Sequence, residues 1–150
     1  MKYLNTKNKD LNGKYLNGVL YSQKVFNLYG VTVSGVFPVF TGIKVCLDAS
    51  VESLYHTLGG TDYAFYHGTM KLATKKLKQL FIIRPDLKKQ FNVAQLVDIE
   101  NEKERISGLT WHHYEELDGD RPIMQLVDEA LHKACVHTGG SYTWNKKHII

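Results

Sequence analysis

Hydrophobic and polar positions along the chain change their period near residue 60. Before that point, short runs rich in Val, Tyr and Phe partly alternate apolar with polar residues, which is typical of β-strands. The Asn-Gly pairs at 12–13 and 17–18 are turn signals, and Pro38 indicates an edge position or a strand break. The pattern predicts strands over residues 15–21, 24–28, 31–40 and 43–47.

A helical period replaces this alternation from Asp62 to Ile83, where apolar residues gather on one face and lysines lie outside. Thr61 is the predicted N-cap, and Pro85 ends the helix and can open the next one. Asn92 and Gln95 have the spacing of a capping box. They predict a second, shorter helix that reaches about residue 100.

The last third of the chain has the order strand, strand, helix. Strands are predicted over residues 109–114 and 121–127, joined by an acidic loop. Asp128 is placed to cap a helix that runs from residue 129 to about His137 and that Gly139-Gly140 ends. The predicted fold class is therefore α+β, with N-terminal antiparallel strands and helices packed on a C-terminal ββα unit.

Length and composition indicate one ordinary globular domain. The 150 residues are 43% hydrophobic and 23% charged, and no apolar run is long enough to span a membrane. The N-terminus has no signal-peptide pattern, so an export signal is expected elsewhere or in a parent polypeptide. The chain has only two cysteines, Cys46 and Cys135, which are far apart in the sequence. A disulfide framework and a Cys-type zinc finger are therefore disfavoured, whereas a single disulfide bond between them is still allowed.

The net charge of +4 is unevenly distributed. Residues 1–75 carry eight Lys and four acidic residues, whereas residues 76–150 carry eleven basic and eleven acidic residues. A basic excess of this size is only a weak indication of nucleic-acid binding. A polyanion near the C-terminal third would have to be attracted by a metal ion and by the N-terminal lysines.

Four of the seven histidines lie between Trp111 and Gly140: His112, His113, His132 and His137. Metal-dependent phosphodiesterases need such a set, because one imidazole can be the general base while others hold a divalent cation. Neighbours on a strand point to opposite faces, which suits a division of labour between His112 and His113. The alternatives are a surface pair or a core histidine with satisfied hydrogen bonds.

His132 and His137 are five residues apart, which places them about 140° apart on an ideal helix. His137 directly precedes Thr138-Gly139-Gly140, where the helix should unwind and let the side chain turn inward. Three imidazoles, from His112, His132 and His137, would leave the open coordination position that a catalytic metal requires. Cys135 is a rival ligand by proximity, although a lone cysteine is more often a small buried apolar residue.

Other polar residues near the histidines are candidates for contact with a substrate. Arg105 and Lys133 could bind phosphate, since charge that develops on a phosphoryl group favours nearby cations, and solvated surface charge is the alternative for each. Gln125 could bridge strand and helix through its amide, or be an exposed polar side chain. Trp111 is expected to anchor the core of the hairpin.

Residues 108–140 resemble the WHH branch of the HNH/endonuclease VII superfamily, nucleases found as toxin domains of bacterial polymorphic toxins. The matching motifs are Gly-Leu-Thr-Trp-His-His (108–113), Met-Gln-Leu-Val-Asp (124–128), His132 and His-Thr-Gly-Gly (137–140), with Trp144 behind them. Weaker similarity upstream, as in Gly-Val-Phe-Pro-Val-Phe (35–40), extends the resemblance over most of the chain.

The resemblance implies a single nuclease domain over residues 1–150. Residues 108–144 would be a ββα-metal catalytic module of the HNH, or His-Me finger, type, and residues 1–107 its platform. By position, His113 is the general base, His112 and His132 are metal ligands, and His137 is a further ligand or a phosphate contact. The substrate-binding candidates are Arg105, Lys133, Gln125 and Thr138.

The resemblance also implies an activity and partners. The expected activity is metal-dependent endonucleolytic hydrolysis of DNA, favoured over RNA, with little sequence specificity because no recognition helix is identifiable. The cofactor would be a divalent ion such as Zn, Mg, Mn or Ni. The expected setting is an antibacterial toxin, delivered into a target bacterium as the C-terminal part of a larger protein and matched by an immunity protein. No membrane partner is expected. A non-catalytic metal-stapled binding module and an RNA-cleaving toxin are the alternatives.

Overall fold

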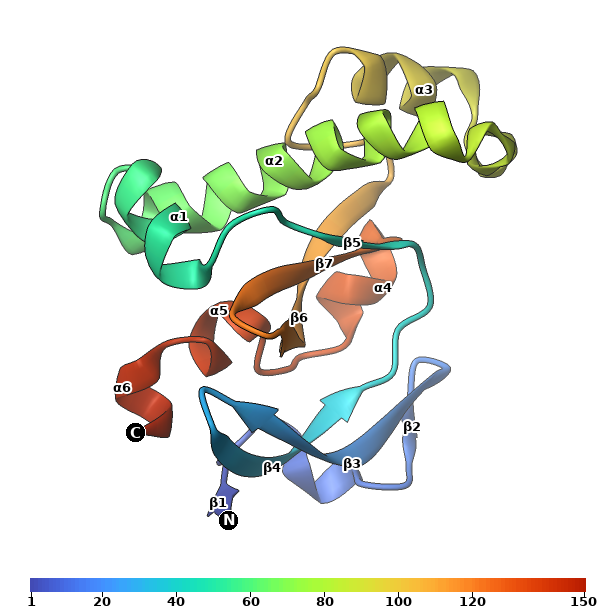
Figure 1. Ribbon diagram of the computed structural model, residues 1–150. Helices are drawn as coiled ribbons and strands as arrows, with labels where there is room; N and C mark the ends of the chain where they lie inside the picture. The colour runs from blue at the N-terminus through green and yellow to red at the C-terminus, as the bar shows by residue number, and fades with distance from the viewer.

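The computed structural model describes residues 1–150 and has a mixed α+β fold, which confirms the predicted class (Figure 1). One sheet has the strand order β1-β4-β3-β2 and contains β1 (Lys2–Tyr3), β2 (Tyr15–Leu16), β3 (Val19–Leu28) and β4 (Val31–Pro38). The other has the order β5-β7-β6 and contains β5 (Lys44–Cys46), β6 (Leu109–Asp118) and β7 (Arg121–Asp128).

Six α-helices and two short 3₁₀ helices complete the chain. The α-helices are α1 (Val51–Thr57), α2 (Asp62–Ile83), α3 (Val93–Glu100), α4 (Glu129–Ala134), α5 (Gly140–Thr143) and α6 (Lys146–Ile149). The 3₁₀ helices are η1 (Lys9–Leu11) and η2 (Pro85–Gln90). None of the helices combines the length and the apolar character needed to cross a bilayer.

The N-terminal sheet is built around one long strand where two were predicted. β3 continues through Ser22-Gln23 because it pairs with β4 along its length, from Tyr21 opposite Pro38 to Leu28 opposite Val31. Strand β4 ends at Pro38, as its missing N–H predicts. The turn between β2 and β3 has positive φ angles at Asn17 and Gly18, as an Asn-Gly hairpin turn requires. The parallel pairing of β1 with β4 was not predicted.

Local signals placed the two middle helices correctly. The Thr61 side chain caps α2 by accepting the N–H of Ala64, and Pro85 opens η2 directly after it. Both bonds of the capping box between Asn92 and Gln95 are present at the start of α3. Helix α1, which no expectation covered, starts at a Ser50 N-cap.

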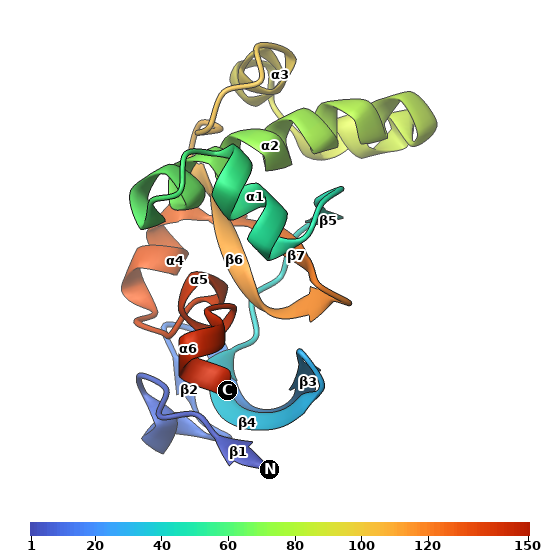
Figure 2. The ribbon, with the colours of Figure 1, turned by 60° about the vertical axis from the view of Figure 1, so that its left-hand side comes forward.

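Helix α2 lies along one face of the β5-β7-β6 sheet, whose strand β6 runs beneath it (Figures 1 and 2). Trp111 of β6 is buried between them, and its Nε1–H donates to the Thr74 hydroxyl of α2 at 2.9 Å. The predicted core role of Trp111 is confirmed. The buried residues of this core are Val45, Leu47, Leu54, Phe65, Met70, Ala73, Leu77, Phe81, Ile99, Ile106, Trp111, Met124, Leu126 and Trp144.

The opposite side of the hairpin faces α4 and the N-terminal sheet. A smaller buried cluster joins them, formed by Val19, Tyr21, Val36, Phe40, Val127 and Cys135. Cys135 is therefore a small buried core residue, and both cysteines are free, so no disulfide links the two halves of the chain. This cluster contains residues from before position 41 and from after position 110, and the histidines lie next to it.

Helix α4 is shorter than predicted. Asp128 caps α4 by accepting the N–H of Leu131, but the helix ends at Ala134, three residues before His137. Gly139-Gly140 therefore does not end it, and Gly140 instead opens α5. A Cβ on Gly140 would lie 2.1 Å from the Tyr114 carbonyl oxygen, so only glycine lets α5 approach β6 this closely.

Replacing Gly140 with alanine is expected to lower the free energy of unfolding by about 1–3 kcal/mol, because the added methyl group overpacks a rigid backbone contact. Gly139→Ala is the matched control, since its Cβ would come no closer than 3.9 Å to the His113 carbonyl oxygen. Urea unfolding of both variants measures the difference. Equal loss in the two variants would mean that the α5–β6 approach does not constrain the fold.

Candidate metal centre

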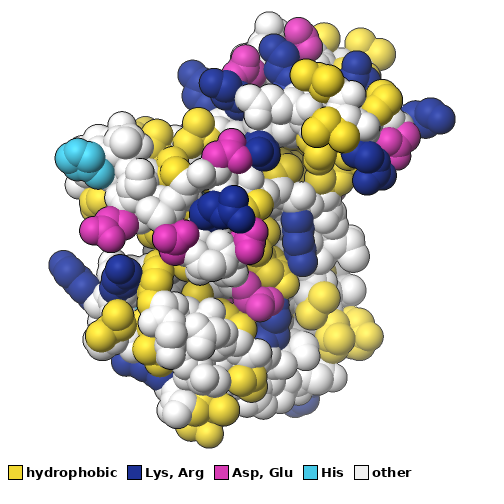
Figure 3. Space-filling model, in the orientation of Figure 1, with side chains coloured by type: hydrophobic (Ala, Val, Ile, Leu, Met, Phe, Trp, Pro, Cys, Tyr) yellow, Lys and Arg dark blue, Asp and Glu magenta, His cyan; other side chains and the backbone are white.

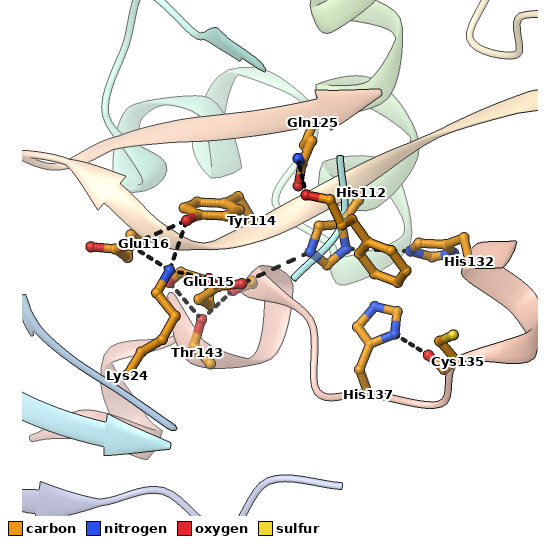
Figure 4. A network of polar contacts seen from close by, with 12 residues as sticks. Lys24, His112, Tyr114, Glu115, Glu116, Gln125, His132, Cys135, His137 and Thr143 are labelled. Carbon is orange, nitrogen blue, oxygen red and sulfur yellow. Dashed lines mark hydrogen bonds and ion pairs between the residues drawn. The ribbon is translucent and has the colours of Figure 1, made fainter. Parts of the chain in front are cut away.

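Three histidines from separate segments meet between the hairpin and the N-terminal sheet. His112 extends from β6, His132 from α4 and His137 from the loop after α4, and one ring nitrogen of each lies within 4.8 Å of the others (Figure 4). The closest pair is His132 Nε2 and His112 Nδ1, which are 3.3 Å apart. These are the three residues predicted as metal ligands.

The early end of α4 positions His137. Since the helix stops at Ala134, the spacing of five residues no longer separates His132 and His137 around a helix, and the chain turns back toward β6. The Nδ1–H of His137 donates to the Cys135 carbonyl oxygen at 2.6 Å. That bond fixes the tautomer, so Nε2 of His137 carries a free lone pair.

A phenylalanine from the N-terminal half forms the wall of this cluster. The Phe40 ring centroid lies 5.1 Å from that of His112, 5.6 Å from that of His132 and 5.4 Å from that of His137. The Gln125 amide donates to the Phe40 carbonyl oxygen at 2.9 Å and holds this segment in place. The expected Gln125 bridge from strand to helix is therefore wrong, because the amide faces the end of the N-terminal sheet.

Burial keeps His132 and His137 uncharged. It is the largest cause that lowers the pKa of His132 to about 4, and repulsion from His137 and His112 adds to it. Burial also lowers the pKa of His137 to about 4, although the bond to the Cys135 carbonyl opposes the change. Both rings are thus neutral at neutral pH, which is the form that ligates a metal.

The donor set fits a divalent transition metal ion. Two imidazole nitrogens bound tetrahedrally at the usual ~2.0–2.1 Å lie roughly 3.3 Å apart, and His112 and His132 already have that separation. Three imidazole ligands leave at least one coordination position open, as in catalytic rather than structural sites. The cluster contains no thiol, which removes Cys135 as a ligand.

His113 lies on the other face of β6, against α2. Its side chain is only 4% exposed, its ring stacks on Tyr66 with centroids 4.7 Å apart, and Trp144 borders it at 5.6 Å. Burial, then the charges of His112 and His132, lowers the pKa of His113 to about 3. The adjacent pair is therefore divided between two faces, as strand geometry predicts.

A threonine on α2 sets the tautomer of His113. The Thr69 hydroxyl donates to the Phe65 carbonyl at 2.8 Å, so its oxygen accepts the Nε2–H of His113 at 2.8 Å. This arrangement places the ring proton of His113 on Nε2 and leaves Nδ1 without a proton. Sequence reasoning did not identify Thr69, since only the packing of α2 on β6 brings the two residues together.

Sequence reasoning missed Glu115, which lies beside His112, and Lys24, which binds Glu115. The Lys24 ammonium of β3 is 2.5 Å from Glu115 Oε2, 2.6 Å from Glu116 Oε2 and 2.7 Å from the Tyr114 hydroxyl (Figure 4). Burial would lower the pKa of Lys24, but the two carboxylates raise it above its usual range. Burial would raise the pKa of Glu115, but the proximity of His112 and the charge of Lys24 lower it.

An irregularity in β6 explains why Glu115 was missed. Residues three apart on a regular strand point to opposite faces, so a plain strand would turn Glu115 away from His112. The pairing register of β6 with β7 shifts between His113 and Leu117, which brings Glu115 to the face of His112. Nothing in the composition of this segment marks the shift.

The remaining predicted substrate contacts lie around the cluster. The Arg105 and Lys133 side chains are 70% and 72% exposed, and both are near Glu129, at 3.9 and 2.9 Å. Thr138 is buried, and its hydroxyl oxygen accepts the backbone N–H of Lys7 at 2.9 Å. Gln125 is buried as well, so only the two cations stand open to solvent.

On the face of the molecule in Figure 3, surface charge is mixed rather than gathered into one patch. On the face shown in Figure 3, basic and acidic side chains are interspersed, and the largest group of basic side chains covers the end near α2 and α3. The picture agrees with the weak charge signal of the sequence.

The hairpin, the helix after it and the three clustered imidazoles define a candidate metal centre of the kind that hydrolytic enzymes use. Residues 29–139, about three quarters of the chain, match the family model of the DNase/tRNase domain of colicin-like bacteriocins, and the chain belongs to this family. Membership implies a nuclease domain of a toxin, with nucleic acid as substrate. No match was found among curated proteins or among solved structures.

Proposed function

We propose that this chain is a metal-dependent endonuclease of the HNH type, in its WHH branch, which hydrolyses DNA with little sequence specificity. The observation that carries the proposal is the convergence of His112, His132 and His137, whose ring nitrogens lie within 4.8 Å of one another. Residues 1–150 would act as one nuclease domain, with 108–144 as its catalytic module and 1–107 as its platform.

His112, His132 and His137 would hold a divalent ion, which supplies Lewis-acid stabilisation of the charge that develops on the phosphoryl and departing oxygens. His113 is the proposed general base. Its Thr69 contact leaves Nδ1 free to accept a proton from the attacking water, and its lowered pKa keeps the ring neutral. The ring is covered by Tyr66, itself 39% exposed, so proton transfer requires this tyrosine to give way to the substrate.

Arg105 and Lys133 are the proposed phosphate contacts. Both project into solvent on either side of Glu129, and Lys133 is adjacent to the proposed ligand His132. A phosphodiester could replace Glu129 as their anionic partner. Gln125 and Thr138 act in this proposal by holding Phe40 and Lys7 around the site, and the Thr138 hydroxyl keeps its proton for donation.

The proposal places the protein in competition between bacteria. The domain would act in the cytoplasm of a target cell after delivery as the C-terminal part of a larger toxin. A cognate immunity protein would protect the producer, and an acidic one would suit the basic excess of residues 1–75.

Incubation of the purified protein with supercoiled plasmid and, separately, with RNA tests the activity. Mg²⁺, Mn²⁺, Zn²⁺ and Ni²⁺ are each supplied in turn. Nicked and linear plasmid are expected with at least one ion, and a chelator should reduce cleavage to background because the imidazoles alone cannot stabilise the phosphoryl charge. Cleavage of RNA alone would indicate an RNA-cleaving toxin. If neither nucleic acid shows chelator-sensitive cleavage, a non-catalytic metal-stapled module is the better description.

A further inference from the structure

Two buried polar atoms beside the histidine cluster lack hydrogen-bond partners. They are Nε2 of His112 and Oε1 of Glu115, in side chains that are each 2% exposed, and they lie 4.0 Å apart. A buried donor or acceptor without a partner is costly, because the hydrogen bonds it made with water are not replaced. Two such atoms facing each other therefore indicate a contact that closes in another state of the site.

Binding of a metal ion supplies that state. His112 presents Nδ1 to His132 and the proposed ion, so the proton of its neutral ring belongs on Nε2, which faces Glu115. Ligating imidazoles commonly donate their second N–H to a carboxylate, which orients the ring and makes it a better ligand. Small movement of His112 toward such a bond would satisfy both unpartnered atoms.

Glu115 is held for this role from two sides. Its other oxygen, Oε2, binds the Lys24 ammonium at 2.5 Å, and its backbone carbonyl accepts the Thr143 hydroxyl of α5 at 3.2 Å. Lys24 is also bound by Glu116, so the Lys24 ammonium has a second anionic partner besides Glu115. The carboxylate is thus fixed in place and keeps one free oxygen directed at His112.

We propose that Glu115 is a positioning residue for the metal centre, which orients His112 through an Nε2–H···Oε1 bond and is itself held by Lys24. The proposal rests on the proposed function only in requiring that the three histidines bind a metal. Glu115 touches neither substrate nor metal in this role, and it acts through the affinity of the site.

Titration with Co²⁺ alone, followed by visible absorption, tests the role without substrate. Glu115→Asp keeps the charge beside Lys24 but withdraws the carboxylate from His112, and affinity for Co²⁺ should fall about 10- to 100-fold. Glu116→Asp is the matched control, since it shortens the other carboxylate on Lys24 and does not face His112. Its affinity should stay within about twofold of the wild type, and thermal unfolding without metal should be similar for both variants.

Equal Co²⁺ affinity in the two aspartate variants would overturn the inference while leaving the proposed function intact. If Glu115→Asp does not fold, Glu115→Gln preserves the length and shape, and a several-fold loss of affinity relative to Glu116→Gln is then the expected result. Equal affinity of those two glutamine variants again contradicts the role. Failure of the wild type to bind Co²⁺ would overturn this inference together with the proposed metal dependence.

Discussion

Replacing His132 with alanine is expected to lower nucleic-acid cleavage by about 10³-fold or more, since a bound metal supplies several kcal/mol of transition-state stabilisation. Loss of one ligand in three should weaken metal affinity by more than the roughly 10- to 100-fold typical of an outer contact. The fold should survive, because His132 is only half-buried on α4 and alanine favours a helix.

Metal titration, cleavage of plasmid and thermal unfolding without metal together check this expectation. His56→Ala is the matched control, because His56 is an exposed histidine on α1 outside the cluster. The wild type should gain thermal stability when metal is added, and His132→Ala should lose that gain. A variant that binds metal as tightly as His56→Ala would exclude His132 as a ligand.

His113→Ala should reduce cleavage by about 10²- to 10⁴-fold, the usual contribution of a general base. Metal affinity should remain near that of the wild type, because His113 lies on the face of β6 opposite the cluster. The two effects distinguish His113 from His112, whose replacement should weaken metal binding itself.

The deep burial of His113 demands a second variant. Alanine leaves a cavity beneath Tyr66 and beside Thr69, so lowered stability could be mistaken for lost catalysis. His113→Gln fills more of that space and cannot act as a base, and it should be equally inactive while more stable. Retained cleavage in the glutamine variant would make His113 a core histidine, and lost metal binding in that variant would make His113 a ligand rather than the base.

Much of the fold could be predicted where local signals decide the outcome. Helix α2 has the bounds that its apolar period, its Thr61 cap and the following Pro85 predicted. The end of α4 was misplaced, because Gly139-Gly140 resembles a helix stop but serves the tight packing of Gly140 against β6. Helix propensity describes a segment by itself, whereas Gly140 is required by the contact of α5 with strand β6.

The histidines of the candidate site could be identified from their motif, but their surroundings could not. Spacing and resemblance gave His112, His132 and His137, which the structure brings together. Lys24 is separated from Glu115 by about ninety residues, and only tertiary packing joins them. Glu115 also depends on the register shift in β6, which breaks the alternation on which strand predictions rest.

Phe40 contacts the three histidines and Lys24 contacts Glu115, so the proposed binding of a metal ion would be linked to completion of the fold. In an unfolded chain the wall and the charge support lie far from the histidines along the sequence, so the complete surroundings of the site form only after both ends of the chain have assembled. A chain that is newly synthesised or unfolded during delivery would therefore lack the proposed nuclease activity until it has folded. A metal ion that binds only the folded form would then stabilise the folded protein.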